Sequence, residues 1–371
     1  MKSKIKDKRI LLLVSTDITF DQRVHRTAKT LADLGANVSI IGRQLSGSVQ
    51  LDWDGIDTER ISLSFQSGPG MYFMMNKKMV DVAGKGPWDI VVSNDFATLL
   101  AGYRISRKHS SAWILDSHEH FIEVPELRGR PFKRYAWHAL GLWATNRLDA
   151  AYTVSDSLAR ILSSTYNIDF SVIENRPLLR SNDTEVTTQT RLLFYQGALN
   201  RGRGLENAII AMRGMPNYKL QIAGDGDIKD ELAAIIRRYH LSDRVELLGR
   251  ISPDELDKFT AQAWLGLNLL EGNSLNYYYS LANKFFDYAQ WGVPSINPAF
   301  PEYIKYHKKF GGCLLLEDQS SKSLQSKIFE LEDDPKAYDQ LKAGALEMKN
   351  HCHWDTQTQK LERIYSDVLE E

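Results

Sequence analysis

The chain has 371 residues, of which 43% are hydrophobic and 25% are charged, as is typical of a soluble globular protein with two domains. The net charge of -1 gives no sign of a nucleic-acid partner, and the two cysteines, Cys313 and Cys352, lack metal-site spacing and suggest packing in a reducing compartment. The first apolar run, Ile10 to Val14, is too short for a signal peptide or a membrane span, so we expect a cytoplasmic protein.

The first forty residues predict a strand, a loop, a helix and a second strand. Ile10 to Val14 is strand-like, a helix with apolar spacing from Val24 to Leu34 closes at Gly35, and Val38 to Ile41 follows. This βαβ order predicts a parallel sheet, which binds ligands where its strands end. Four charged residues crowd the first strand end, where they either hold the loop together as Asp–Arg pairs or contact a ligand: Asp17, Asp21, Arg23 and Arg26.

Two further predicted strands each end in polar side chains. The strand from Asp89 to Val92 leads to Ser93-Asn94-Asp95, and the strand from Trp113 to Leu115 leads to Asp116-Ser117-His118-Glu119-His120. Titratable groups directly after a buried strand are typical of a functional site. We therefore predict that His118 acts at the site, the alternative being a structural histidine.

Basic and aromatic residues alternate between Arg128 and Arg147. They are Arg128, Arg130, Lys133, Arg134 and Arg147, with Phe132, Tyr135, Trp137 and Trp143. Such a helix is a candidate for peripheral contact with the anionic inner face of a membrane. The alternative, which we favour, is a helix whose tryptophans face the core and whose charges face water.

A polar stretch from Arg176 to Thr190 lacks apolar periodicity and predicts a linker. We place an N-terminal domain at residues 1–178, the linker at 179–190 and a C-terminal domain at 191–355. The last residues, 356–371, predict an amphipathic helix that is a candidate to pack back on the first domain.

Strands and helices alternate again after the linker. A glycine-rich loop from Gly197 to Gly204 follows the strand Leu192 to Tyr195, and its Arg201 and Arg203 can pair with phosphate. Two later strands end before Gly224 and before Gly249-Arg250.

The stretch from Ser280 to Pro294 predicts about three turns of helix, with Ser280 as the N-cap. An open helix N-terminus favours phosphate, and Lys284 would add a full charge. Asn283 and Asp287 share one face, so the amides would hold a diphosphate and Asp287 would hold sugar hydroxyls. The alternative is an ordinary amphipathic helix on which Lys284 and Asp287 are solvated.

Taken in order, these motifs resemble the GT-B glycosyltransferases, most closely family 4. D-Q-R-V-H-R, D-S-H-E and T-V-S-D-S look like motifs of that family's first domain. G-x-L-x-x-x-R-G, A-G-D-G, L-L-G-R and N-K-F-F-D-Y-A-Q-W-G-V-P-S-I look like motifs of its second domain. The resemblance implies an α/β fold of two Rossmann-like parallel-sheet domains facing each other across a cleft.

The resemblance also implies a retaining glycosyltransferase that uses a UDP- or GDP-linked sugar and needs no metal or other cofactor. Its acceptor would be a glycan or a lipid-linked glycan, in cell-surface polysaccharide synthesis. The implied catalytic residues are His118, Glu119 and Asp287. The implied donor-binding residues are Arg201, Arg203, Gly224, Arg250, Ser280, Asn283, Lys284 and Asp287.

The chain departs from the family pattern at two positions. Tyr279 stands where the first of two acidic residues is usual, and Glu271 lies further upstream. Ala198 stands where an arginine is usual, so Arg201 or Arg203 would take its role. Two alternatives therefore stay open: a non-hydrolysing sugar-nucleotide epimerase, and a GT-B scaffold subunit without activity.

Overall fold

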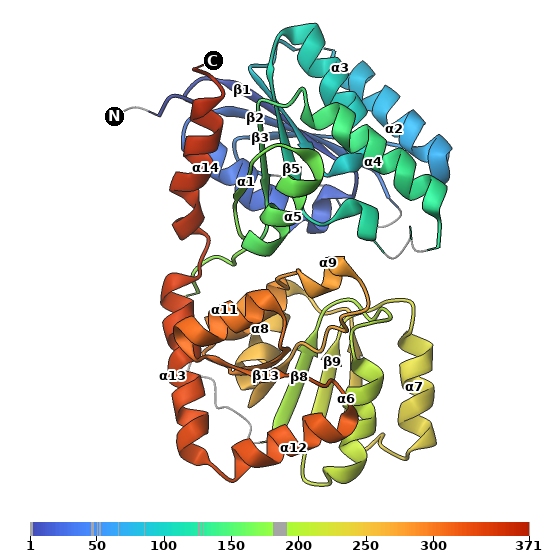
Figure 1. The fold of residues 1–371 in the computed structure, drawn as a ribbon, viewed down its shortest axis with the longest axis vertical. Helices are drawn as coiled ribbons and strands as arrows, with labels where there is room; N and C mark the ends of the chain where they lie inside the picture. Colours follow the sequence, from blue (N-terminus) through green and yellow to red (C-terminus); the bar gives the residue numbers. More distant parts are fainter. Residues whose placement is uncertain are drawn as a thin grey trace. The chain divides into compact units, whose positions relative to one another are not determined.

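The computed structural model describes residues 3–45, 48–49, 51, 53–65, 67–84, 86–124, 127, 129–180 and 191–370. Contacts between residues divide the chain into two units, Met1–Asn175 with Gln357–Glu371, and Arg176–Thr356. Each unit is built around its own parallel sheet, so the predicted pair of Rossmann-like α/β domains is confirmed (Figure 1). Most of the predicted linker, from residue 181 to 190, lies outside the described residues.

The first unit has a seven-stranded sheet with the order β3-β2-β1-β4-β5-β6-β7, in which every pairing is parallel. Its strands are β1 (Arg9–Val14), β2 (Asn37–Arg43), β3 (Ile56–Ile61), β4 (Ile90–Asn94), β5 (Ala112–Ser117), β6 (Ala150–Thr153) and β7 (Phe170–Val172). The central strands are nearly continuous apolar runs because helices cover both faces of a parallel sheet.

Helices lie on both faces of this first sheet (Figure 1). They are α1 (Gln22–Asp33), α2 (Gly68–Ala83), α3 (Leu99–His109), α4 (Pro131–Thr145), α5 (Asp156–Tyr166) and α14 (Asp355–Asp367). Helices α2 to α5 pack on the face that carries Leu11 and Trp113. The C-terminal helix α14 packs on the opposite face, where the hydroxyl groups of Tyr365 and Tyr152 lie 3.1 Å apart.

The second unit has a six-stranded parallel sheet with the order β10-β9-β8-β11-β12-β13. Its strands are β8 (Leu192–Gln196), β9 (Lys219–Ala223), β10 (Val245–Gly249), β11 (Leu265–Leu267), β12 (Ser295–Pro298) and β13 (Cys313–Leu316). Its helices are α6 (Leu205–Ala211), α7 (Lys229–Arg238), α8 (Pro253–Gln262), α9 (Leu275–Tyr278), α10 (Asn283–Gln290), α11 (Pro301–Phe310), α12 (Ser321–Glu332) and α13 (Pro335–His351). Cys313 and Cys352 are buried free thiols in one apolar cluster, which confirms their packing role.

Helix α10 begins two residues later than the sequence predicts. It is eight residues long, and its N-cap is Ala282 rather than Ser280. A short helix, α9, precedes it, and the Ser280 hydroxyl donates to the Tyr277 carbonyl at 2.9 Å at the end of that turn. The predicted N-cap role of Ser280 is therefore wrong, because the preceding turn engages its hydroxyl.

Helix α4 fits the favoured expectation only in part. Trp137 and Trp143 pack against aromatic rings of the first unit, as expected. Phe132 and Tyr135 face outward, and Arg128 lies outside the described residues. Within the described part of the chain, no helix is long and apolar enough to cross a membrane.

Candidate active site

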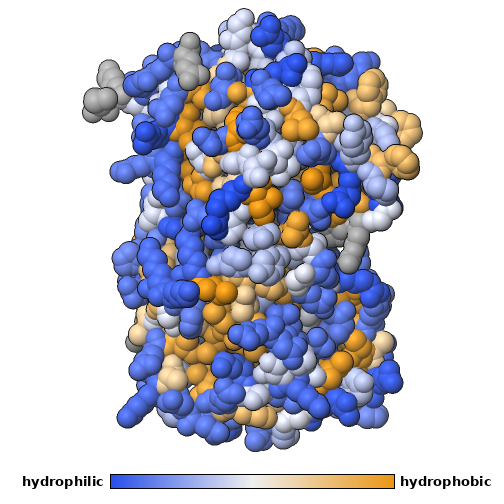
Figure 2. All heavy atoms as spheres, viewed as in Figure 1, coloured by the Kyte–Doolittle hydropathy of each residue, from blue (hydrophilic) through white to orange (hydrophobic). Residues whose placement is uncertain are grey.

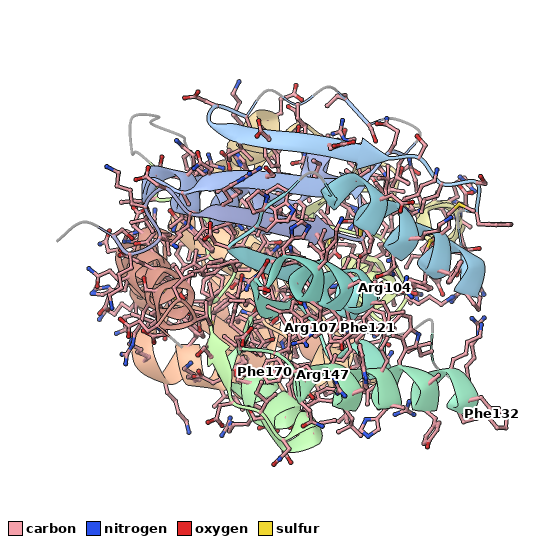
Figure 3. All side chains as sticks on the ribbon, turned by 90° about the horizontal axis from the view of Figure 1, so that it is seen from above. Arg104, Arg107, Phe121, Phe132, Arg147 and Phe170 are labelled. Atoms are coloured by element: carbon pink, nitrogen blue, oxygen red, sulfur yellow. The ribbon has the colours of Figure 1, made fainter. Side chains whose placement is uncertain are left out.

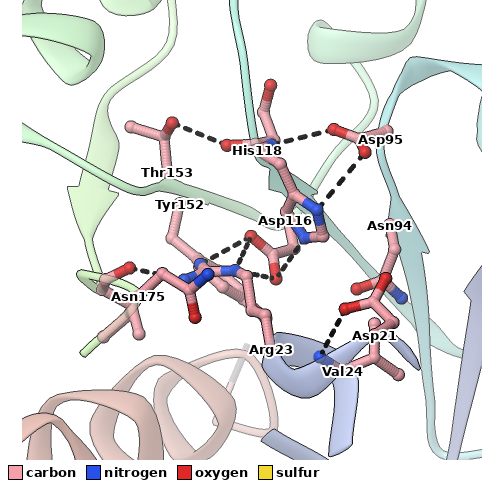
Figure 4. Close-up of polar contacts among 12 residues, drawn as sticks. Asp21, Arg23, Val24, Asn94, Asp95, Asp116, His118, Tyr152, Thr153 and Asn175 are labelled. Atoms are coloured by element: carbon pink, nitrogen blue, oxygen red, sulfur yellow. Dashed lines mark hydrogen bonds and ion pairs between the residues drawn. The ribbon is translucent and has the colours of Figure 1, made fainter. Parts of the chain in front are cut away.

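The first unit gathers five polar side chains on one face of its sheet. Arg23 comes from α1, Asp95 follows β4, Asp116 and His118 lie at the end of β5, and Tyr152 lies on β6. We call these five residues the imidazole cluster (Figure 4). They meet because the carboxyl ends of parallel strands lie at one edge of a sheet.

Arg23 and Asp116 form a buried, bidentate ion pair. Two guanidinium nitrogens of Arg23 donate to the Asp116 carboxylate at 2.8 to 3.2 Å, and a third donates to the Ile173 carbonyl at 2.8 Å. Arg23 is 3% exposed and Asp116 is fully buried. Burial would raise the pKa of Asp116, but Arg23 and His118 outweigh it and hold that pKa at about 2. The pair is therefore charged on both sides at neutral pH.

His118 lies between two carboxylates. Its Nε2 is 3.2 Å from Asp116 Oδ2, and its Nδ1 is 3.4 Å from Asp95 Oδ2. Burial would lower the pKa of His118, but Asp95 and Asp116 outweigh it and raise that pKa to about 9. His118 is therefore an imidazolium at neutral pH, with each ring nitrogen close to a carboxylate oxygen, rather than a general base.

Asp95 holds this arrangement with a strained backbone. Its φ is 64°, in the left-handed region that non-glycine residues seldom adopt. In that conformation its carboxylate accepts from the His118 backbone N–H at 2.8 Å and also faces the imidazole ring. Strain of this kind persists where the surrounding contacts require it, and it concentrates at functional sites.

The charged loop after β1 uses other partners than those predicted. Asp17 pairs with Arg60 at 3.3 Å, Asp21 caps α1 through the Val24 N–H, and Arg23 reaches Asp116. Asp17 and Arg23 therefore each have an ion-pair partner outside this loop. Asp116 is the residue whose role sequence reasoning missed, although its position two residues before His118 places both on one side of the strand end.

Glu119 and His120 directly follow His118 in the sequence. The Ser117 hydroxyl donates to the Glu119 carbonyl at 3.0 Å. Burial first, and then the nearby Arg134 and His138, lower the pKa of His120 to about 4. Of the two histidines, His120 is therefore neutral and His118 is charged at neutral pH.

The second unit gathers a different set of side chains. Tyr195 and Gln196 end β8, Arg203 lies in the loop that follows, and Lys284 and Asp287 lie on α10. We call these residues the cation cluster. Lys284 is 7% exposed, so the expectation of a solvated lysine is wrong.

Aromatic rings, rather than carboxylates, face both cations of this cluster. The Lys284 Nζ lies 3.8 Å from the centroid of the Tyr195 ring, and the Arg203 Cζ lies 5.0 Å from that of Tyr277. The Arg203 Nε is buried without a hydrogen-bond partner in the described structure. Burial first, and then Arg203, lower the pKa of Lys284 well below its ordinary value, and Asp287 offsets this only in part.

Asp287 is oriented by a hydrogen-bonded chain. Gln196 Nε2 donates to Asp287 Oδ2 at 2.9 Å, and the Thr260 hydroxyl donates to Gln196 Oε1 at 2.7 Å. The chain fixes the side-chain amide of Gln196 from both sides. Gln196 is a second residue that sequence reasoning missed.

Two glycines bring backbone close to the cation cluster. Gly197 and Gly224 have φ of 133° and 144°, and a side chain at Gly224 would meet the Gly197 carbonyl at 1.9 Å. A side chain at Gly197 would meet the Lys284 Nζ at 3.2 Å. Both positions therefore require glycine, which lets the two loops and the Lys284 side chain pack closely.

The other predicted donor-binding residues lie in varied surroundings. Arg201 is exposed and pairs with Glu231, so Arg203 rather than Arg201 lies beside Lys284. Arg250 is exposed, with its Nε 3.6 Å from Asp225. Asn283 is the first residue of α10, on the same helix as Asp287.

The acidic position upstream of α10 also differs from the family pattern. Tyr279 closes α9, and its ring packs edge-on against Tyr278 at 4.9 Å. Glu271 lies beside the glycine-rich loop from Gly197 to Gly204, because its backbone N–H donates to the Gly202 carbonyl at 2.9 Å. Among the residues that the structure describes, no group of three or more His, Cys, Asp or Glu is placed to hold a metal ion.

Two models of known families match successive parts of the chain. Residues 21–175 match the model described as Glycosyltransferase Family 4, and residues 180–269 match Glycosyl transferases group 1. A search of curated protein sequences finds no match.

Solved structures show the same fold at low identity. Sucrose-phosphate synthase from Thermosynechococcus elongatus is similar with a TM-score of 0.81 and 16% identity, over 98% of this chain and 100% of that one. HepE from Anabaena, in complex with UDP and glucose, has a TM-score of 0.77 and 15% identity over 97% and 99%. Starch synthase IV from Arabidopsis thaliana, bound to ADP and acarbose, has a TM-score of 0.74 and 11% identity over 99% and 100%.

Proposed function

Since the chain belongs to the family 4 glycosyltransferases, with the GT-B fold, we propose that it transfers a sugar from a nucleotide donor with retention at the anomeric carbon. The donor is a UDP- or GDP-linked sugar. The acceptor is a glycan or a lipid-linked glycan, in the synthesis of a cell-surface polysaccharide.

The cation cluster is the observation that supports this proposal most. When the nucleotide leaves, negative charge develops on its diphosphate while the donor sugar becomes cation-like. Fixed positive groups stabilise the negative charge on the diphosphate. Arg203 is such a group, since no carboxylate pairs with it in the described structure, and Lys284 becomes one when a bound diphosphate raises its pKa. Because these side chains supply the positive charge, we expect transfer without a divalent metal.

The remaining candidates take separate roles in the proposed reaction. Asp287, held by Gln196, accepts hydrogen bonds from sugar hydroxyls of the nucleotide. His118, whose two ring nitrogens face Asp116 and Asp95, orients the donor sugar or the acceptor, and Glu119 lies next to it in sequence. Since His118 holds its proton at neutral pH, the leaving phosphate takes the proton of the acceptor hydroxyl.

The structural relatives have been solved with different nucleotides, UDP in one case and ADP in another. HepE has been solved with UDP and with UDP-glucose. HepE resembles this chain in fold alone, so the base and the sugar of the donor have to be determined by experiment.

Nucleotide binding is the first test. Calorimetric titration of the purified chain with UDP and with GDP should give one binding isotherm with one of the two, and a panel of the matching nucleotide sugars should raise the melting temperature with the true donor. No binding of either nucleotide, together with an inert panel, would favour a scaffold subunit and overturn the proposal.

Product analysis is the second test. With the donor identified, NMR of the transferred sugar should show the anomeric configuration of the donor retained, and chelation of divalent metals should leave the rate unchanged. Incubation without acceptor should leave the donor intact or slowly hydrolysed. An epimerised donor would identify a sugar-nucleotide epimerase instead.

A further inference from the structure

Exposed aromatic rings concentrate at one place on the first unit. Of the five exposed aromatic side chains in the described residues, four lie in or just before the first turns of α2 and α4, and the fifth is Phe329. The four are Phe132 at 90% exposure, Tyr135 at 74%, Phe73 at 68% and Phe65 at 54%. Figure 2 shows apolar side chains gathered over α2 at the upper right of the molecule. Scattered apolar residues are normal on a protein surface, but four large rings together mark an interaction site.

The two helix starts are neighbours. The rings of Tyr72 on α2 and Trp137 on α4 meet edge-to-face at 5.0 Å, and Phe65 packs beside the first turn of α2, over Gly70. These contacts hold the two helices together and leave Phe73 and Phe132 outside. Figure 3 shows Phe132 at the outer end of α4, pointing away from the fold.

The first turns of α4 lie entirely in the solvent. Every residue from 131 to 136 is exposed, so this end of the helix projects beyond the unit. A projecting helix end with two aromatic rings can insert into a deformable partner surface without displacing any part of the protein. Both helix starts also lie at the sheet edge that carries His118, because α2 follows β3, and α4 follows β5, at the carboxyl ends of parallel strands.

The charge around these rings is positive. Arg130 and Lys133 make no ion pair in the described structure, whereas Arg134 pairs with Glu123. Neither α2 nor α4 has an acidic residue in its first turn. Further along α2, Lys77 and Lys78 precede Asp81, so the α2/α4 face, defined by the four exposed rings with Arg130 and Lys133, has a cationic border.

We propose that the α2/α4 face docks on an anionic lipid bilayer. Phe132 and Tyr135 enter the headgroup region, where aromatic rings are favoured, and Arg130 and Lys133 meet the lipid phosphates. This inference rests on the proposed function in one respect, namely that a lipid-linked acceptor is presented by the same bilayer. The α2/α4 face lies at the edge of the sheet that bears His118.

The test is binding of the full chain to lipid vesicles without nucleotide or acceptor. The chain should co-sediment with vesicles of phosphatidylcholine and phosphatidylglycerol, should bind vesicles of phosphatidylcholine alone weakly, and should be released by salt. The double variant Phe132→Ser/Tyr135→Ser and the single variant Lys133→Glu should each reduce binding to anionic vesicles, the double variant by about tenfold or more.

Matched controls lie in the second unit. Leu178→Ser removes an exposed apolar side chain and Lys342→Glu reverses an exposed charge, and both should bind vesicles like the unmodified chain. All four variants alter exposed residues, so their melting temperatures should agree with that of the unmodified chain. UDP or GDP affinity of the double variant should also be unchanged, which separates failure of docking from failure of the proposed transfer.

Two outcomes would overturn the proposal. One is equal binding of the double variant and the unmodified chain to anionic vesicles. The other is no vesicle binding together with a dimer in sedimentation velocity that the double variant dissociates, which would assign the face to a second copy of this chain.

Discussion

The two clusters of the molecule hold positive charge in opposite ways. In the imidazole cluster, Arg23 and His118 each face carboxylates, and the pKa of His118 rises to about 9. In the cation cluster, Lys284 and Arg203 face aromatic rings, and the pKa of Lys284 falls well below its ordinary value. Both clusters are largely withdrawn from water, so the difference lies in their partners.

This contrast indicates what each cluster contributes. A buried cation with carboxylate partners is electrostatically balanced within the protein, so removing one partner alone destabilises the fold. A buried cation next to a second cation is unfavourable until negative charge arrives, and a nucleotide diphosphate carries such charge. We therefore expect substitutions in the imidazole cluster to reduce stability, and substitutions in the cation cluster to reduce ligand affinity.

The largest expected effect is that of Arg23→Met on stability. The substitution leaves the fully buried Asp116 carboxylate without its bidentate partner, which should cost about 3–5 kcal/mol in the free energy of unfolding. Urea denaturation followed by circular dichroism measures this loss. Nucleotide affinity of the folded variant should stay near that of the unmodified chain.

Removing both partners provides the control. The double variant Arg23→Met/Asp116→Leu should recover part of the loss, because no unpaired charge remains buried. The pH dependence gives a second check: folding lowers the pKa of Asp116 from 3.8 to about 2, so its contribution is complete above pH 3.8 and is lost as the pH falls through about 2. A loss below about 1 kcal/mol for Arg23→Met would contradict the balanced-pair interpretation.

The second effect is that of Lys284→Met on nucleotide affinity. Losing a hydrogen-bonded charge to phosphate should weaken binding by about 1.5–3 kcal/mol, measured by calorimetric titration. The free energy of unfolding should stay equal or increase, because the variant no longer buries an ammonium group next to Arg203. Lys342→Met, on an exposed face of α13, is the matched control and should change neither quantity.

Proton uptake tests the same lysine independently. Folding lowers the pKa of Lys284 below 10.5, so the unfolded chain binds more protons and stability should increase as the pH rises toward 10.5. A bound diphosphate raises this pKa again, so nucleotide binding should take up protons. Calorimetry in buffers of different ionisation enthalpy should show this uptake in the unmodified chain and less of it in Lys284→Met. Equal uptake in both would point to another group.

Much of the fold can be predicted from local sequence pattern. Short apolar runs such as Ile10 to Val14 and Leu192 to Tyr195 are strands in the structure, and their alternation with helical spacing predicts parallel sheets. The apolar spacing from Val24 to Leu34, closed by Gly35, also correctly predicts a helix, which is α1 in the structure. Each of these signals lies within a few residues of the feature it predicts.

The site is harder to predict because its partners are distant in sequence. Asp116 lies 93 residues from Arg23, and Gln196 lies 91 residues from Asp287. Ser280 shows a related limit: its hydroxyl has the chemistry of an N-cap, yet α9 ends next to it and the Tyr277 carbonyl accepts a hydrogen bond from it. The burial of Lys284 depends likewise on Tyr195, which no local pattern around α10 reveals.

The third effect concerns the titration of His118. Its pKa should be near 9 by NMR of the imidazole Cε1 proton. Asp95→Asn should lower this pKa by about one unit or more, which corresponds to about 1.4 kcal/mol, because the variant removes one of the two carboxylates that raise it. Because folding raises this pKa above 6.5, the stabilising contribution is complete below pH 6.5 and is lost as the pH rises through about 9. His120, with a pKa of about 4, is the internal control. Titration of His118 near 6.5 would mean that the carboxylates do not hold its proton.

The smallest effect is that of the Tyr195 ring beneath Lys284. Its face stabilises the charged ammonium at 3.8 Å, so Tyr195→Leu should weaken nucleotide binding by about 1 kcal/mol, while Tyr195→Phe should keep the affinity. Tyr195→Phe loses only the hydrogen bond to the Ala198 carbonyl, so its cost should appear in the melting temperature alone. If both variants bind nucleotide equally well, the ring does not support the cation. The contrast between carboxylate-held and ring-held charge would then rest on burial alone.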